Sequence, residues 1–220
     1  MDSAFKAYKE RYGGYPPSDF NKLDDTQSPQ YQALVRHIAH AFPHCDAMAE
    51  AAAVKKLGVK SPAQALCFWL QGLSPDPEHP VSKLLDDPTA RIPMFNFEKA
   101  RLKYPAGKKQ CPVYVSEGGG DAPYVFFSHE NYATQTPFNA DFKQGGKGIA
   151  RPYRSDNKDI GEFMNPKSFQ IISAGHDGDF GGGKGSFPSG TGYQASDKDN
   201  LTNFADGTLG DAIPAQGRRK

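Results

Sequence analysis

The chain of 220 residues carries 26 Lys or Arg against 25 Asp or Glu, and its formal net charge of +1 does not indicate nucleic acid or an anionic membrane as a partner. Glycine (23) and proline (18) are frequent, which argues against a helical bundle, and 12% aromatic residues exclude a disordered chain. The sequence has no run of about 18 apolar residues and no signal region after Met1, so we expect a soluble chain that folds as one domain.

Helix signals open the chain. Apolar residues spaced by three and four predict a first helix that Ser3 caps and that a Gly-Gly pair ends after Tyr12. Ser28 followed by Pro29 predicts the start of a second helix, which carries one apolar stripe and ends before Pro43.

Two further helices are expected before residue 74. Asp46 is predicted to cap an alanine-rich third helix, and Ser61 followed by Pro62 predicts the start of a fourth. Cys67 lies in the apolar run of this fourth helix, so we expect its side chain to be buried. Residues 74–93 are rich in proline and are expected to form an irregular connection.

Strand signals follow, as short β-branched and aromatic runs bounded by Gly, Pro and Asn. Residues 112–116 and 124–128 are predicted to pair as a hairpin, and residues 169–173 form a third predicted strand. From Gly175 to Leu201 the chain consists mostly of small and polar residues. Helices followed by strands indicate the α+β fold class.

Cysteines and histidines offer two sets of potential metal ligands. Cys45, Cys67 and Cys111 are widely spaced with no CxxC pattern, so they indicate neither a zinc knuckle nor a disulfide framework, and one disulfide remains open. His37 and His40 are predicted to face outward together from the second helix. A zinc or copper site there competes with a plain exposed polar face, which we favour.

The segment from Gly175 to Gly185 is open to three interpretations. A phosphate loop is disfavoured because Gly185 stands where Ser or Thr would ligate magnesium and because no helix signal follows. A calcium loop fits better, since calcium accepts carboxylates mixed with backbone carbonyls, although the spacing excludes an EF-hand. The third interpretation is a solvated glycine-rich turn with incidental aspartates.

The chain has no GxSxG or HExxH motif and no recognisable Ser, His and Asp grouping, so we do not expect an enzyme. Basic and aromatic residues interleave in two stretches, which we interpret as solvated surface and not as a nucleic-acid interface. The first stretch holds Lys99, Arg101, Lys103, Lys108 and Lys109 with Phe97 and Tyr104, and the second holds Arg151, Tyr153 and Arg154.

Several stretches resemble a known family. The runs NPKSFQIISAGHDG (165–178), DNLTNF (199–204) and GTLGD (207–211) are similar to the C-terminal part of bacterial pseudopilins related to the major pseudopilin of type II secretion. AFKAYKERYGGYPP (4–17) resembles the end of the pilin stem helix and the turn after it. The middle of the chain, with RHIAHAFP (36–43) and PAQALCFWL (62–70), resembles a subset of these proteins with a large insertion.

This resemblance implies a calcium site in the C-terminal loop. By motif position the ligands map onto Asp177, Asp197 and Asp199, with the backbone carbonyl of Ser173 as a further donor. The segment between Asp177 and Asp197 is more than double the length typical of the family. Because it contains few apolar residues, a bound cation would help to offset the entropy of ordering it.

The resemblance also implies a pilin-like α+β fold, in which a truncated N-terminal helix packs on a small antiparallel sheet. Residues 1–19 would form the stem helix and its turn, residues 20–92 a helical insertion, and residues 93–220 the sheet and a long calcium-type loop, all within one domain.

The function implied is that of a structural subunit of a pseudopilus or pilin-like filament associated with type II protein secretion. Its partners would be further pseudopilin subunits and components of the secretion machine, at the periplasmic face of the inner membrane or in the cell envelope, with no nucleic acid. Membrane contact would come only through an N-terminal helix that this sequence lacks. The alternative function is a soluble secreted binding or adhesive module with the same calcium-ordered surface.

Overall fold

The computed structural model describes residues 1–104, 111–118, 120–140, 146–157 and 159–214. Lys108 and Lys109, from the first basic stretch, lie outside these described residues. The chain forms two compact units, which divide between Tyr114 and Val115. The expected segments 1–19, 20–92 and 93–220 of one pilin-like domain stay a prediction. With helices in the first unit and small, mostly antiparallel sheets in the second, the fold class is α+β, as predicted.

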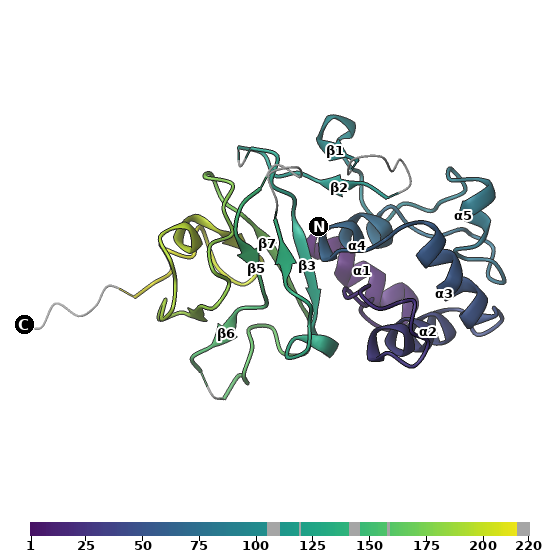
Figure 1. Ribbon diagram of the computed structural model, residues 1–220, viewed down its shortest axis with the longest axis horizontal. Coiled ribbons are helices and arrows are strands. Elements are labelled where there is room, and N and C mark those ends of the chain that lie inside the picture. The colour runs from purple at the N-terminus through teal and green to yellow at the C-terminus, as the bar shows by residue number, and fades with distance from the viewer. Residues whose placement is uncertain (105–110, 119, 141–145, 158, 215–220) are drawn as a thin grey trace, which may run out of the picture. The chain divides into compact units, whose positions relative to one another are not determined.

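Helices dominate the first unit (Figure 1). Its elements are α1 (Asp2–Tyr12), α2 (Pro29–Ala41), α3 (Ala47–Lys56), α4 (Pro62–Leu70), α5 (Lys83–Asp86), the 3-10 turn η1 (Lys99–Arg101), and the antiparallel pair β1 (Leu102–Lys103) and β2 (Val113–Tyr114).

Local capping explains why most of these helices begin where the sequence predicts. The side chains of Ser28, Asp46 and Ser61 accept hydrogen bonds from backbone N–H groups in the first turns of α2, α3 and α4. The prediction for α1 was wrong at its start, because the helix begins at Asp2 and therefore contains Ser3. Its end is confirmed: Gly13 adopts the left-handed conformation with φ of 79°.

Trp69 on α4 is the centre of the first unit's core. Its side chain is fully buried, and its indole Nε1 donates a hydrogen bond to the carbonyl of Pro17 at 2.8 Å. The ring of Tyr8 from α1 meets the Trp69 ring edge-on at a centroid distance of 5.8 Å. This packing joins the first and fourth helices around one aromatic cluster.

His37 does not face outward, so the predicted pairing of His37 with His40 on an exposed face was wrong. Only 9% of His37 is exposed, and its Nε2 lies 2.9 Å from the hydroxyl of Tyr8. Burial, with the nearby charge of His40 as a second cause, lowers the pKa of His37 to about 4. The side chain belongs to the core because Tyr8 supplies a partner for its polar ring.

All three cysteines lie in the described part of the chain, and none of them is disulfide-bonded. Cys67 is buried, as predicted, and burial raises the pKa of its thiol well above the ordinary value. Cys111 is also buried, and its Sγ lies 3.5 Å from the carbonyl of Gln64.

A three-stranded antiparallel sheet organises the second unit. It consists of β3 (Val125–Ser128), β7 (Phe169–Ser173) and β9 (Leu201–Thr202), with β7 in the middle. Two further pairs of short strands lie in the same unit: β4 (Phe138–Asn139) pairs with β5 (Ile149–Ala150), and β6 (Arg154–Ser155) pairs in parallel with β8 (Ser186–Phe187). The described residues of this unit also include the 3-10 turns η2 (His129–Asn131) and η4 (Ser196–Asp199).

The predicted third strand is confirmed as β7, but the predicted hairpin was wrong. Residues 125–128 pair with residues 169–172 of β7, beside which they run in Figure 1. Val115, from the first predicted strand, instead forms an isolated antiparallel bridge with Pro123, which lies in the predicted loop. Phe126, Phe127 and Phe169 are fully buried, so burial of the apolar β7 favours the distant pairing over the local turn.

Within the described ranges, no helix combines the length and the apolar character that a bilayer span requires.

Candidate metal centre and a basic pocket

The loop predicted to bind calcium connects β7 to β9, and its two ends are held together. Ser173, at the end of β7, pairs with Leu201 at the start of β9. Gly175 has φ of 63°, and a Cβ atom at this position would lie 2.3 Å from the carbonyl oxygen of Asp199. Only glycine therefore allows this close approach, which brings the beginning of the loop onto Asp199.

Asp199 connects the two sides of the loop. Its Oδ2 accepts hydrogen bonds from the backbone N–H groups of His176 at 2.8 Å and Asp177 at 3.0 Å. Its Oδ1 is buried and has no hydrogen-bond partner among the residues that the structure describes. A buried carboxylate oxygen without a donor is unfavourable, and a cation would satisfy it.

Asp177 is exposed and lies next to Asp199 in this loop. Its Oδ1 accepts a hydrogen bond from the N–H of Asp179 at 2.7 Å. Partial desolvation, reinforced by the negative charges of Asp199 and Asp179, raises the pKa of Asp177. A positive charge between Asp177 and Asp199 would relieve this repulsion.

Asp197 is fully buried and its two oxygens are both occupied by protein donors. The hydroxyl of Tyr153 donates to Oδ1 at 3.1 Å, and the N–H of Gln194 donates to Oδ2 at 2.7 Å. Burial, and then the charge of Asp197, raises the pKa of Tyr153. Asp197 thus ties the loop to residue 153, and its role as a calcium ligand stays a prediction.

Asn200 contributes a second unsatisfied oxygen to the loop. It is fully buried, and its Nδ2 donates to the hydroxyl of Tyr153 at 2.9 Å and to the carbonyl of Phe180 at 3.2 Å. Its Oδ1 finds no hydrogen-bond partner in the described ranges. The sequence places Asn200 at the end of the loop but gives no sign that it is buried.

The oxygen atoms of Asp177, Asp199 and Asn200 are ligands of the type that calcium accepts, but their side chains alone do not form a metal site. In the described part of the chain, no three side chains of His, Cys, Asp or Glu gather in a way that could hold a metal ion. A site here would use the carboxylates of Asp177 and Asp199, the Asn200 amide oxygen and backbone carbonyls such as that of Ser173. Such mixed oxygen ligands are accepted by calcium.

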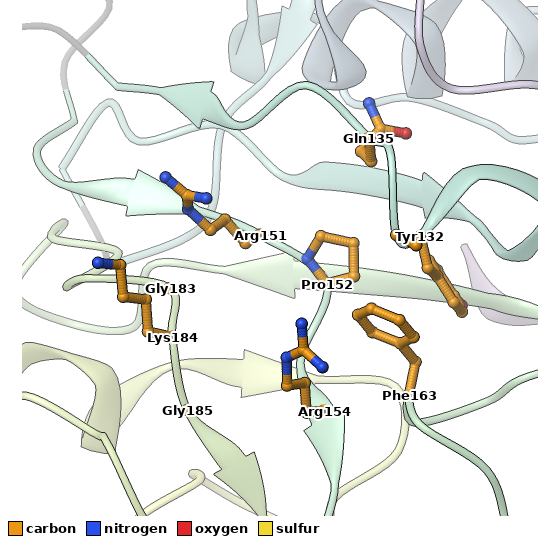
Figure 2. Close-up of a pocket in the computed structure, with 10 residues that line it drawn as sticks. Tyr132, Gln135, Arg151, Pro152, Arg154, Phe163, Gly183, Lys184 and Gly185 are labelled. Carbon is orange, nitrogen blue, oxygen red and sulfur yellow. The ribbon is translucent and has the colours of Figure 1, made fainter. Parts of the chain in front are cut away.

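The second unit also contains a pocket of about 360 Å³, shown in Figure 2, which we call the basic pocket. Three of its lining residues are cationic, namely Arg151, Arg154 and Lys184, and Tyr132 and Phe163 supply aromatic surface. Its remaining lining residues are Ala133, Gln135, Pro152, Gly183 and Gly185.

The backbone around the basic pocket is fixed by the core. The fully buried side chain of Gln170 on β7 accepts from the N–H of Tyr153 at 2.7 Å and donates to the carbonyl of the same residue at 3.0 Å. The N–H of Arg154 donates to the carbonyl of Gly185 at 3.2 Å. These bonds hold residues 151–154 against β7 and against Gly185.

From the sequence we expected Arg151 and Arg154 to be solvated surface residues. Lys184 lies in the segment for which a phosphate loop was disfavoured. The structure brings all three to one pocket, through the parallel pairing of β6 with β8. No local pattern signals such a pairing.

Comparisons of the chain with models of protein families, with curated proteins and with solved structures gave no match.

Proposed function

We propose that this chain is a pilin-like structural subunit of a pseudopilus or related filament associated with type II secretion, with a C-terminal loop that calcium orders. The resemblance of residues 4–17, 165–178 and 199–211 to pseudopilins supports the class of protein. The observation that carries the calcium site is the buried, unpartnered Oδ1 of Asp199. In such a subunit the loop's order would decide whether its surface can pack against a neighbouring subunit.

Calcium titration of the purified chain by calorimetry tests the site. In Asp199→Asn the amide oxygen can still accept from His176 and Asp177, while an NH₂ group replaces the unpartnered oxygen and repels a cation. We expect saturable calcium binding that weakens at least about tenfold in this variant, since a charged ligand interaction contributes about 1.5–3 kcal/mol. Asp206→Asn changes an exposed carboxylate of the same unit and serves as the control.

Binding that stays equal in Asp199→Asn, or a titration with no heat at several temperatures, contradicts the calcium site. The filament role is tested separately, by expressing the complete native gene product in its own cells and shearing off surface filaments. We expect the protein in the sedimenting filament fraction. Recovery only as a dispersed protein contradicts the filament role and favours the binding or adhesive module.

A further inference from the structure

The described residues neutralise only part of the positive charge of the basic pocket. Arg154 forms an ion pair through Nη1 with Oε1 of Glu162. Arg151 and Lys184 have no carboxylate partner among the described residues, and no carboxylate lines the pocket. The pocket therefore has two uncompensated positive charges.

Arg151 also has an unsatisfied hydrogen-bond donor. Its Nε is buried and has no partner within the described part of the chain. A buried donor without an acceptor is costly, and an anion could accept from this Nε only if the Arg151 side chain shifts to expose it to the pocket. Guanidinium groups suit this purpose because their parallel N–H groups match two oxygens of a carboxylate or phosphate.

The cationic side chains are positioned so that one ligand could reach them. In Figure 2 Arg151 and Lys184 extend to the same side, and Arg154 stands between Lys184 and Phe163. The guanidinium of Arg154 lies over the Phe163 ring at 5.1 Å, which keeps it in place by a cation–π interaction.

Glycine brings the Lys184 segment close to Arg151. Gly183 has φ of 57°, and a Cβ atom there would lie 2.4 Å from the carbonyl oxygen of Ile149. No other residue fits at this position without displacing β5. Together with the bonds of Gln170, this contact makes the pocket rigid, which reduces the entropy lost on binding.

These features define the ligand class. Two uncompensated charges match the dianion of a phosphate monoester better than a single carboxylate. A cavity of about 360 Å³ holds more than a phosphate group, and the aromatic residues Tyr132 and Phe163 that line it add apolar surface beside the charges. We propose that the basic pocket binds a phosphate monoester carried on a small ring, such as a sugar phosphate.

This proposal is independent of the calcium site, although Lys184 belongs to the same loop. The phosphate monoester could come from a soluble sugar phosphate or from a lipid headgroup, and the chemistry recognised is the same. Titrations at submillimolar calcium and in chelator separate the two proposals: phosphate binding in both conditions supports the pocket even if calcium does not bind.

The test is calorimetry of the full chain with glucose 6-phosphate, inorganic phosphate and unphosphorylated glucose. We expect saturable binding of the sugar phosphate, weaker binding of inorganic phosphate and none of glucose. Arg151→Ala should weaken binding about tenfold to a hundredfold, as expected for a lost charged hydrogen bond. Arg151→Lys should recover part of the loss, because it restores the charge but not the paired N–H groups.

Lys167→Ala is the matched control, because it removes an exposed positive charge of the same unit that does not line the pocket. It should leave binding unchanged. Co-sedimentation with phosphatidylcholine vesicles containing phosphatidic acid then identifies the source: retention that depends on Arg151 indicates a lipid headgroup, and its absence indicates a soluble ester. No saturable binding of any phosphate probe, or equal losses in Arg151→Ala and Lys167→Ala, overturns the proposal.

Discussion

At the residue scale, the buried carboxylate of Asp197 shows how far the site could be read from the sequence. The resemblance placed Asp177, Asp197 and Asp199 in one loop, and the structure does bring Asp177 and Asp199 into contact through a backbone hydrogen bond. The bond from Tyr153 to Asp197 spans 44 residues, and no local pattern encodes it. Sequence reasoning therefore found the loop but could not assign separate roles to its carboxylates.

His37 makes stability depend on pH. Its pKa is about 4 in the folded chain and about 6.5 when unfolded, so between these values only the unfolded chain takes up the proton. The contribution of His37 to the free energy of unfolding is therefore fully present above pH 6.5. It falls by on the order of 3 kcal/mol as the pH drops toward 4.

Chemical denaturation at pH 7 and pH 4.5 measures this effect. We expect His37→Gln to lose less stability between the two pH values than the unmodified protein, because its side chain has no proton to accept. His44→Gln, which changes an exposed histidine, should behave as the unmodified protein does. Equal pH dependence in His37→Gln and the unmodified protein would show that His37 titrates normally.

At the element scale, Glu50 of α3 anchors the start of α5. Only 2% of Glu50 is exposed, and its Oε2 accepts from the N–H groups of Val81 at 2.6 Å and Ser82 at 2.7 Å. Its Oε1 accepts from the hydroxyl of Ser82. The acidic side chain of one helix thus satisfies the backbone donors at the beginning of another.

Glu50→Ala should therefore destabilise the protein by more than about 2 kcal/mol, because it leaves buried N–H groups without an acceptor. Urea denaturation measures the loss. Glu10→Ala removes an exposed carboxylate from α1 and should change stability by less than about 0.5 kcal/mol. A loss in Glu50→Ala no larger than that in Glu10→Ala would refute the anchoring role.

The sequence predicts the elements that depend on local contacts, and it does not predict those that depend on distant residues. Helix starts follow from Ser28, Asp46 and Ser61 because a cap and the N–H groups it accepts from lie within three residues. Strand partners depend on distant residues: Val125 pairs with Ile172, and the local turn before Val125 does not decide the pairing. The hairpin prediction failed for this reason, and so did the expected outward face of His37, whose partner Tyr8 lies on another helix.

At the scale of the whole molecule, calcium should raise the melting temperature. Binding to the folded state alone stabilises it, by about 2.7 kcal/mol when the calcium concentration is 100 times the dissociation constant. Differential scanning calorimetry in calcium and in chelator measures the shift. We expect it in the unmodified protein and in Asp206→Asn, and we expect it to be about half as large or smaller in Asp199→Asn. Identical melting curves in calcium and in chelator are incompatible with calcium binding to the folded chain.

Hydrogen exchange reports how far a cation orders the loop between Ser173 and Leu201. The amides of His176 and Asp177 donate to Asp199, so they report on the proposed site itself. We predict that calcium slows exchange across residues 174–200 in the unmodified protein, and that the same calcium concentration slows it less in Asp199→Asn. Exchange in this loop at the same rate with calcium and with chelator would contradict ordering of the loop by calcium.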